Sequence, residues 1–224
     1  MLAPALIAVG AWLLLRRTVR AFAHPAAWPS NRWGMKAKTG GAADYLRDLT
    51  TEGAELIAAA GFPPSVALAQ AMVETGWGDS MRANPFGQRG AGDAGSVSIT
   101  TTECYGAAGE ACETQTGQDF ARFSSLAAAC RAYARFLDGP MYRGGHKYRR
   151  SDPGRWLLWL WGMGYATGPN YPSAVVDASR RVGLTLEDLR LVIPWDDSHR
   201  AILDQLQQHA AGKARRSATR ALLA

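Results

Sequence analysis

Glu74 is the side chain of this sequence that is best placed for acid–base chemistry. It lies in residues 63–78, which read PPSVALAQAMVETGWG. The two prolines and a capping serine predict that a helix begins here, and Gly76 predicts its end. Glu74 then lies in the last turn, one turn beyond Gln70 on the same face. The negative end of the helix dipole disfavours a carboxylate there, and burial beside Trp77 would raise its pKa further, as a general acid at neutral pH requires.

Other chemistries find little support in the sequence. The four histidines are scattered without the spacing of zinc ligands, and no GxSxG motif or Cys–His pair indicates acyl transfer. With 47% hydrophobic and 20% charged residues, the composition is that of an ordinary globular protein. The net charge of +6 favours an anionic partner such as cell-wall carboxylates, anionic lipid or nucleic acid. No motif that reads a nucleic-acid groove accompanies this charge, so we expect no nucleic-acid partner.

Glu74 belongs to the first of four motifs that follow one another along the chain. They are AQ at 69–70 with ETGWG at 74–78; NPFG at 84–87; TTE at 101–103, followed by FSS at 123–125 and YARFL at 133–137; and GYATGPNY at 164–171. Together they resemble the bacterial endo-β-N-acetylglucosaminidases of the flagellar peptidoglycan-hydrolase type, family seventy-three of the glycoside hydrolases. The resemblance covers residues 42–183, and four ordered motifs are far more specific than any one of them.

The resemblance implies an α+β fold that is mainly α, with a lysozyme-like helical domain and a small β-hairpin lobe over the substrate groove. It implies hydrolysis of the β-1,4 bond after N-acetylglucosamine in peptidoglycan, without a cofactor or a metal. On the family's motifs, Glu74 is the general acid, Glu103 the base or the stabiliser of an oxocarbenium ion, and Tyr165 a residue that lines the catalytic centre. The same motifs supply the expected substrate-binding residues, which are Gln70, Trp77, Asn84, Phe86 and Tyr171.

Two departures and two alternatives accompany this interpretation. Gly168 replaces an aspartate of the family's fourth motif, and Pro85 replaces a leucine of the second. A lytic transglycosylase or a muramidase would act on the same polymer, and a transglycosylase needs no second carboxylate beside Glu74. A non-catalytic wall-binding or virion structural protein could retain the fold, but it would have no need of a carboxylate beside Trp77.

The first residues of the chain indicate a membrane segment. An uncharged run begins at Leu2 and ends at Leu15, short of the roughly 20 residues that span a bilayer. Basic residues follow the run instead of preceding it, which is not typical of a cleaved signal peptide. We therefore expect a membrane anchor in residues 1–17 and a linker in 18–41, before the catalytic domain (42–183) and a C-terminal helical extension with a basic tail (184–224).

The charges beside this run bear on localisation. The basic flank favours the cytoplasmic side, whereas a wall enzyme must act outside the cytoplasm, in the periplasm or cell wall. Association with a bacteriophage virion is the alternative that resolves this conflict.

Two strands and a pair of cysteines are predicted in the middle of the chain. Residues 97–104 and 112–118 read as strands joined by a loop over 105–111. Cys104 and Cys112 flank the loop, where facing positions are close enough for a disulfide. Cys130, the third cysteine, falls on the apolar face of a helix over 125–137 and is expected to be a buried thiol.

A tryptophan-rich helix and a polar C-terminal segment complete the prediction. Residues 155–163 (RWLLWLWGM) follow a capping aspartate and a first-turn proline, and they indicate a core helix. At least one of Trp156, Trp159 and Trp161 is expected to reach the groove, where its face could stack on a sugar ring. Helices are also expected over 172–182, 185–191 and 197–209, and residues 213–220 (KARRSATR) read as a solvated basic tail.

Overall fold

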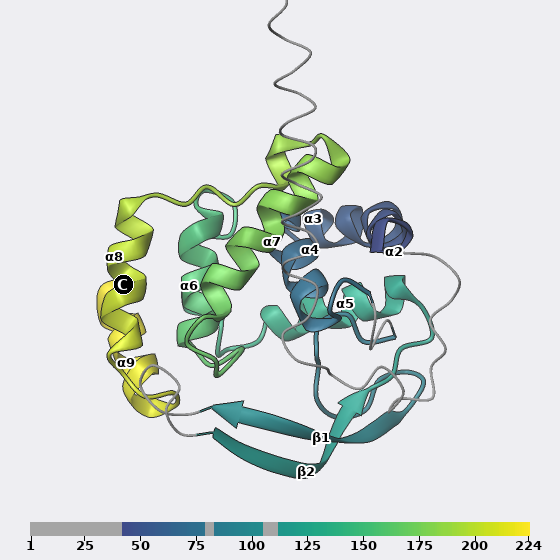
Figure 1. The fold of residues 1–224 in the computed structure, drawn as a ribbon, viewed down its shortest axis with the longest axis horizontal. Helices are drawn as coiled ribbons and strands as arrows, with labels where there is room; N and C mark the ends of the chain where they lie inside the picture. Colours follow the sequence, from purple (N-terminus) through teal and green to yellow (C-terminus); the bar gives the residue numbers. More distant parts are fainter. Residues whose placement is uncertain (1–41, 79–82, 105–111) are drawn as a thin grey trace, which may run out of the picture. The chain divides into compact units, whose positions relative to one another are not determined.

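Helix α4 (Pro64–Glu74) lies at the centre of the described chain in the computed structural model (Figure 1). The structure describes residues 42–78, 83–104 and 112–224, which all belong to one compact unit. In chain order, its elements are α2 (Ala42–Leu49), a π-helical turn (Thr50–Ala54), α3 (Glu55–Ala59), α4, β1 (Ser96–Cys104), β2 (Cys112–Ala121), α5 (Leu126–Leu137), a 3-10 turn (Arg143–Gly145), α6 (Pro153–Gly162), α7 (Tyr171–Leu186), a second 3-10 turn (Leu189–Leu191), α8 (Asp197–Gln207) and α9 (Lys213–Leu222). The predicted α+β architecture, mainly α with a small hairpin, is confirmed.

Helix α4 is enclosed by the other helices because it is apolar on all sides. Every residue from Ser65 to Met72 is buried, and α7 packs along its length. Pro63 precedes the first turn as predicted, but the predicted serine cap is wrong, since no side chain caps this helix. Burial on every side leaves only the C-terminal end of α4 to open onto a site.

A Schellman motif ends α4 and turns the chain sharply. The amide of Trp77 donates to the carbonyl of Met72 at 2.8 Å, and that of Gly76 donates to Val73 at 3.3 Å. Gly76, Trp77 and Gly78 all have positive φ, with φ 63° at Trp77, where a non-glycine residue costs about 1–2 kcal/mol. Glu74 is therefore the last helical residue, as predicted, and it is followed by a strained turn.

Strands β1 and β2 form the predicted hairpin at one end of the helical body (Figure 1). They pair antiparallel from Ser96 opposite Ala121 to Cys104 opposite Cys112, with an irregularity between Ile99 and Thr101. The connecting residues 105–111 lie outside the described residues. The pairing places Glu103, the penultimate residue of β1, opposite Glu113, at the end of the hairpin next to the connecting residues.

Helix α6 is a core helix, and one expectation about it is wrong. The side chain of Asp152 caps it by accepting from the amide of Arg155 at 2.9 Å, as predicted. Trp156, Trp159 and Trp161 are 0%, 5% and 0% exposed, so none of them presents a ring to a groove. Neighbouring helices cover both sides of the tryptophan stripe, which the sequence of α6 alone does not reveal.

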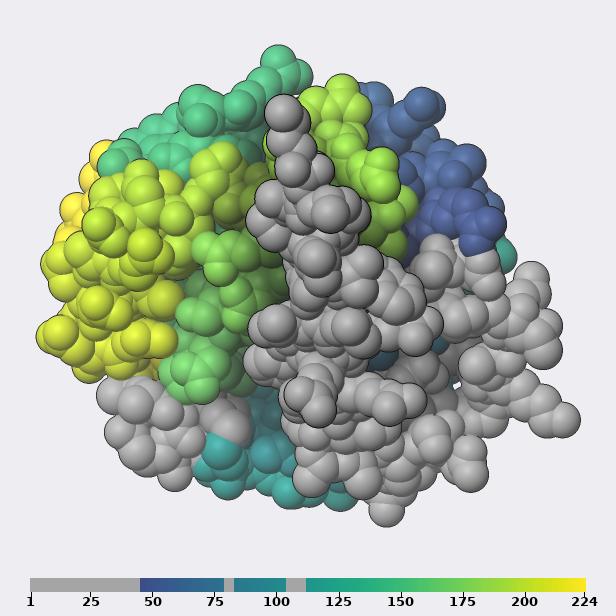
Figure 2. Space-filling view, turned by 45° about the horizontal axis from the view of Figure 1, so that its top comes forward, coloured from purple at the N-terminus to yellow at the C-terminus, as the bar shows by residue number. Residues whose placement is uncertain are grey.

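The C-terminal segment packs against the rest of the fold. Helices α8 and α9 contact α6 and each other, and in Figure 2 the yellow C-terminal chain lies directly beside the green residues that precede it. The predicted solvated tail is wrong, because residues 213–220 belong to α9, in which Arg215 and Thr219 are buried. The helix expected over 185–191 is also wrong, because Glu187 has positive φ (54°) and ends α7.

The predicted membrane segment lies outside the described residues. In the part of the chain that the structure describes, no helix is both long and apolar enough to cross a bilayer.

Candidate active site

The carboxyl group of Glu74 is held between two segments that are distant in sequence. Its Oε1 accepts a hydrogen bond from the hydroxyl of Tyr171 at 2.9 Å. Its Oε2 faces Gly87, where a Cβ added to the glycine would lie 2.8 Å from this oxygen. Gly87 also has a positive φ of 59°, so both the backbone conformation and the close approach favour glycine there. The NPFG segment and the start of α7 thus enclose the end of α4.

This enclosure changes the acidity of Glu74. Burial raises its pKa from 4.5 to about 7, and the negative charge of Glu103 adds to the rise, while the hydrogen bond from Tyr171 opposes it. A carboxyl group with this pKa keeps its proton over most of the range below pH 7. The sequence predicted the direction of the shift, and the structure identifies burial as its main cause.

A chain of buried polar groups orients Tyr171. Gln70 donates from Nε2 to the hydroxyl of Tyr171 at 3.1 Å and accepts at Oε1 from the hydroxyl of Tyr133. Gln70 and Tyr133 are 0% and 1% exposed. Burial raises the pKa of both tyrosines well above the usual value, so their hydroxyls stay neutral donors. Because Tyr133 donates to Gln70 and Gln70 donates to Tyr171, the hydroxyl proton of Tyr171 is directed at Glu74.

The NPFG segment is fastened by its own asparagine and by aromatic packing. The side chain of Asn84 donates to the carbonyl of Gln88 at 2.8 Å and accepts from its amide at 2.9 Å. Phe86 stacks on Tyr133 with ring centroids 4.0 Å apart, and its carbonyl accepts from the Tyr165 hydroxyl at 2.9 Å. These contacts determine where Gly87 meets Glu74.

Glu103 projects from β1 toward the same region. Its Oε1 pairs with Arg89, and its Oε2 accepts from the hydroxyl of Thr167 at 2.9 Å. The side chain is 17% exposed, so it is only partly open to solvent. Its negative charge raises the pKa of Glu74, so the two carboxylates interact electrostatically.

The predicted site residues therefore fall into two groups. Three of them, Gln70, Asn84 and Phe86, are buried, and their polar atoms form hydrogen bonds within the protein. This geometry favours a structural role over direct contact with a substrate. The partly exposed group comprises Glu74, Trp77, Glu103, Tyr165 and Tyr171. The ring of Trp77 also packs on the core, with the guanidinium of Arg181 5.7 Å from its centroid.

Sequence reasoning missed Arg89 and Thr167 as contacts of Glu103. Thr167 lies in the fourth motif, whose order along the chain could have singled it out. Arg89 lies in no motif, and it reaches the carboxylate because its backbone bridges to Phe120 of β2.

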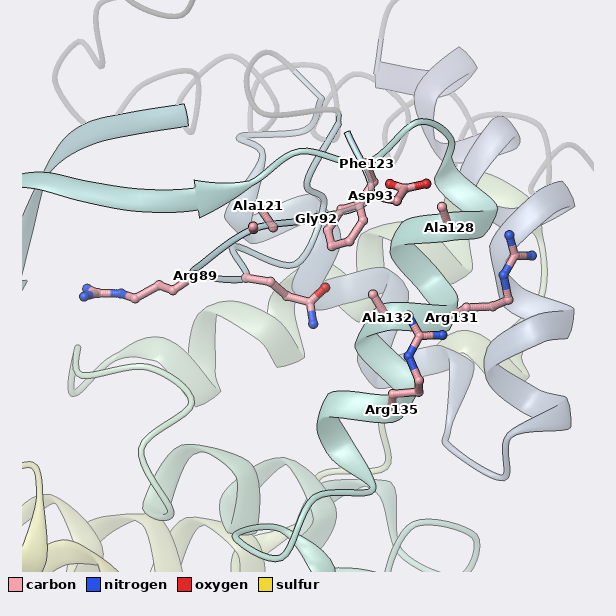
Figure 3. A pocket seen from close by; sticks show the side chains of 11 residues that line it. Arg89, Gly92, Asp93, Ala121, Phe123, Ala128, Arg131, Ala132 and Arg135 are labelled. Carbon is pink, nitrogen blue, oxygen red and sulfur yellow. The ribbon is translucent and has the colours of Figure 1, made fainter. Parts of the chain in front are cut away.

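A cavity of about 300 Å³ adjoins these residues on the side of α5 (Figure 3). Gln88, Arg89, Phe123, Arg131 and Arg135 are among the side chains that line it. In Figure 3, Arg89 extends in the opposite direction from Arg131 and Arg135. The one acidic residue of the lining, Asp93, accepts from the amide and hydroxyl of Ser124, which lowers its pKa. The lining therefore has a basic character, and Arg89 belongs both to it and to the ion pair with Glu103.

The hairpin cysteines face each other in the register. Cys112 is disulfide-bonded, Cys104 lies directly opposite it, and Cys130 is a buried free thiol as predicted. The side chain of Cys104 lies outside the described residues, so its pairing with Cys112 stays a prediction.

Comparison with solved structures finds the same fold in proteins of known structure. The catalytic domain of the autolysin Auto from Listeria monocytogenes is 26% identical, over 69% of this chain and 92% of that chain, with a TM-score of 0.52. A peptidoglycan hydrolase mutant from Sphingomonas sp. A1 is 22% identical, over 65% and 98%, with a TM-score of 0.54. An N-acetylmuramoyl-L-alanine amidase from Staphylococcus aureus is 21% identical, over 72% and 50%, with a TM-score of 0.57, so this chain spans half of that protein. The last two matches show the fold alone.

Comparison at the level of sequence assigns the family. Among curated proteins, none is similar enough to this chain to match it. The glucosaminidase family model, described as mannosyl-glycoprotein endo-beta-N-acetylglucosaminidase, matches residues 52–184, which is more than half of the chain. The match includes all four motifs that carried the resemblance, and the chain accordingly belongs to the glucosaminidase family of glycoside hydrolases.

Proposed function

We propose that this glycosidase hydrolyses the β-1,4 bond after N-acetylglucosamine in peptidoglycan, with Glu74 as the general acid. The observation that carries the proposal is the raised pKa of Glu74, about 7, with the charge of a second carboxylate, Glu103, acting on it. A protonated carboxyl group at neutral pH can transfer its proton to the leaving oxygen as the bond breaks. Two carboxyl groups with different surroundings are the common equipment for this reaction.

The geometry supports a separate role for each oxygen of Glu74. Tyr171 donates to Oε1 and so keeps the proton off that oxygen. The proton then belongs on Oε2, which approaches Gly87 closely because this residue has no side chain. When the bond between C1 and the leaving oxygen breaks, that proton passes to the leaving oxygen, and Glu74 becomes a carboxylate that Tyr171 still stabilises.

Glu103 is proposed as the base or as the stabiliser of the positive charge on the sugar. A water that adds to C1 gives up a proton, and a carboxylate on the hairpin can accept it. Arg89 and Thr167 hold this side chain from two directions, which orients its free face. In this scheme Tyr165 and Trp77 line the substrate space, whereas Gln70, Asn84 and Phe86 position the residues that line it.

The cavity on the side of α5 supports peptidoglycan as the polymer. Arg131 and Arg135 are exposed, and neither forms an ion pair within the described chain. Peptidoglycan carries free carboxylates on its peptide stems, whereas an uncharged N-acetylglucosamine polymer offers none. A basic cavity that shares Arg89 with the Glu103 ion pair is complementary to such a strand.

The decisive experiment replaces Glu74 by glutamine. Glu74→Gln keeps the size of the side chain and its acceptor for Tyr171 but removes the transferable proton. We expect the variant to lose nearly all cleavage of purified peptidoglycan in a zymogram, and activity within a few-fold of the wild type would refute the proposal.

The products distinguish hydrolysis from its alternatives. Mass analysis of the new sugar ends should find reducing N-acetylglucosamine. Anhydro ends would indicate a lytic transglycosylase, reducing muramic acid a muramidase, and the absence of new ends a protein that only binds the wall or builds a virion.

We also propose that the run from Leu2 to Leu15 attaches the enzyme to a membrane, so that it acts outside the cytoplasm. The run is uncharged, and residues 18–41 would let the catalytic region reach beyond the lipid headgroups. The alternative, a virion-associated enzyme, predicts activity that does not sediment with membranes after expression.

A further inference from the structure

The fourth motif forms a loop that contacts both proposed catalytic carboxylates. We define the site loop as residues 165–171. Its Thr167 donates to Glu103, and its Tyr171, the first residue of α7, donates to Glu74. A shift of this loop would therefore move the hydrogen-bond donors of both carboxylates together.

Three consecutive carbonyl groups of the site loop each accept a hydrogen bond from a side chain elsewhere in the fold. Arg215 donates to the carbonyl of Thr167 at 3.2 Å, Trp161 to that of Gly168 at 2.9 Å, and Gln207 to that of Pro169 at 2.9 Å. Trp161 belongs to α6, Gln207 to α8 and Arg215 to α9. A Cβ added at Gly168 would meet no atom within 4 Å, so at this residue the loop is held through its backbone carbonyl.

Arg215 is an unusual residue for this purpose because it is buried. It is 1% exposed, its guanidinium carbon lies 4.1 Å from the ring centroid of Trp161, and its Nε donates to the carbonyl of His209 at 3.3 Å. Burial lowers the pKa of Arg215, and its Nη2 atom has no hydrogen-bond partner among the described residues. Burying a cation without a carboxylate partner is costly, so stability alone does not explain an arginine here.

We propose that Arg215 is a positioning residue for catalysis, and that α8 and α9 act as a brace for the site loop. The family match ends at residue 184, so both helices lie beyond the segment that defines the glucosaminidase family. Arg215 holds the backbone of Thr167, whose side chain holds Glu103. Gln207 holds the backbone of Pro169, two residues before Tyr171. The inference rests on the proposed function, because it assigns a role within that reaction.

The test compares substitutions in the full-length protein on soluble peptidoglycan fragments, with initial rates measured over a range of concentrations. Arg215→Met keeps the stem that stacks on Trp161 but removes the donors. We expect kcat to fall by about ten- to a hundredfold, since a misplacement of about 1 Å can cost 10²-fold, while KM changes less. Arg215→Lys, which retains the charge and an ammonium group that can donate to one of the two carbonyls, should recover part of the loss. Arg220→Met, on an exposed arginine of the same helix, is the matched control and should leave both constants unchanged.

A double-mutant cycle separates positioning from a general loss of structure. If Arg215 acts through Thr167, then Arg215→Met should cost a smaller factor in kcat in a Thr167→Val background than in the wild type. An equal factor in both backgrounds would overturn the proposal, and so would a kcat within twofold of wild type in folded Arg215→Met.

A second variant covers the case in which Arg215→Met does not fold. Gln207→Met removes the donor to Pro169 from a partly exposed position, and it should lower kcat several-fold with unchanged thermal stability. An unchanged kcat in Gln207→Met would then overturn the brace. If the wild-type protein cleaves no peptidoglycan, the proposed function fails and the inference fails with it; if only the variants behave as wild type, the inference fails alone.

Discussion

Replacing the proposed general acid should make the protein more stable at neutral pH. The carboxyl group of Glu74 has a pKa of about 7 in the folded protein against an ordinary value of 4.5, chiefly because it is buried. Below about pH 4.5 the group is protonated in both the folded and the unfolded chain, and folding costs no proton transfer. As pH rises toward 7, the unfolded chain gains the freedom to ionise while the folded chain does not, so stability is lost across this window.

The magnitude follows from the size of the shift. Each pKa unit corresponds to about 1.4 kcal/mol, so a shift from 4.5 to about 7 amounts to a loss of at most about 3.5 kcal/mol above pH 7. Glu74→Gln does not ionise, and its amide oxygen can still accept from Tyr171. For a chain of this size, about 3.5 kcal/mol corresponds to roughly 7–14 °C in the melting temperature.

Thermal unfolding of the wild type and of Glu74→Gln, monitored at pH 4 and at pH 8, measures this effect. The two proteins should melt at similar temperatures at pH 4, and the variant should melt higher at pH 8. Glu55→Gln, on an exposed carboxylate in the first turn of α3, controls for the removal of one negative charge. An equal melting difference at both pH values, or a variant that is less stable at pH 8, would refute the assignment of burial as the cause of the shift.

The remaining predictions concern the hairpin and the N-terminus. Glu103→Gln should lower the rate of peptidoglycan cleavage substantially, though less than Glu74→Gln, and an unchanged rate would reduce Glu103 to a surface charge. If Cys104 and Cys112 are bridged, reduction should lower activity by loosening the strand that carries Glu103, with a stability change of about 2–3 kcal/mol at most; two free thiols by mass spectrometry of the native protein would dismiss the bridge. Deletion of residues 1–41 should give a soluble protein with full activity on isolated peptidoglycan, whereas an inactive truncation would show that the segment belongs to the catalytic fold.

Local features of the sequence predicted local features of the fold. Gly76 predicted the end of α4, and Asp152 followed by Pro153 predicted the cap of α6. The strands predicted over 97–104 and 112–118 end and begin at the right residues, since β1 ends at Cys104 and β2 begins at Cys112. In each case a residue acts on neighbours within a few positions, so the pattern carries the physical cause.

Features that depend on distant segments were not predictable in this way. The rings of α6 look available in the sequence, but distant residues cover them. Phe62 stacks on Trp156, the turn at Gly144 and Gly145 lies against Trp159, and Arg215 of α9 lies over Trp161. Residues 213–220 read as a solvated tail because most of these residues are polar. One of them, Arg215, instead points inward onto the ring of Trp161. Nothing in the spacing of that segment distinguishes Arg215 from the arginines beside it.

The raised pKa of Glu74 also depends on residues outside its own helix, so substitutions in those residues should change it. The end of a helix dipole acts on any residue in a last turn and is worth only about 0.3–1 kcal/mol at an exposed site. A rise in pKa from 4.5 to about 7 is larger than that, and it requires burial by the NPFG segment beyond the end of α4 and by Tyr171, 97 positions along the chain. Substitutions that loosen Asn84 or Gln70 should therefore return the pKa of Glu74 toward its ordinary value without touching Glu74 itself. The raised pKa of the proposed general acid comes from the closure of the fold around α4, and the helix supplies only its position.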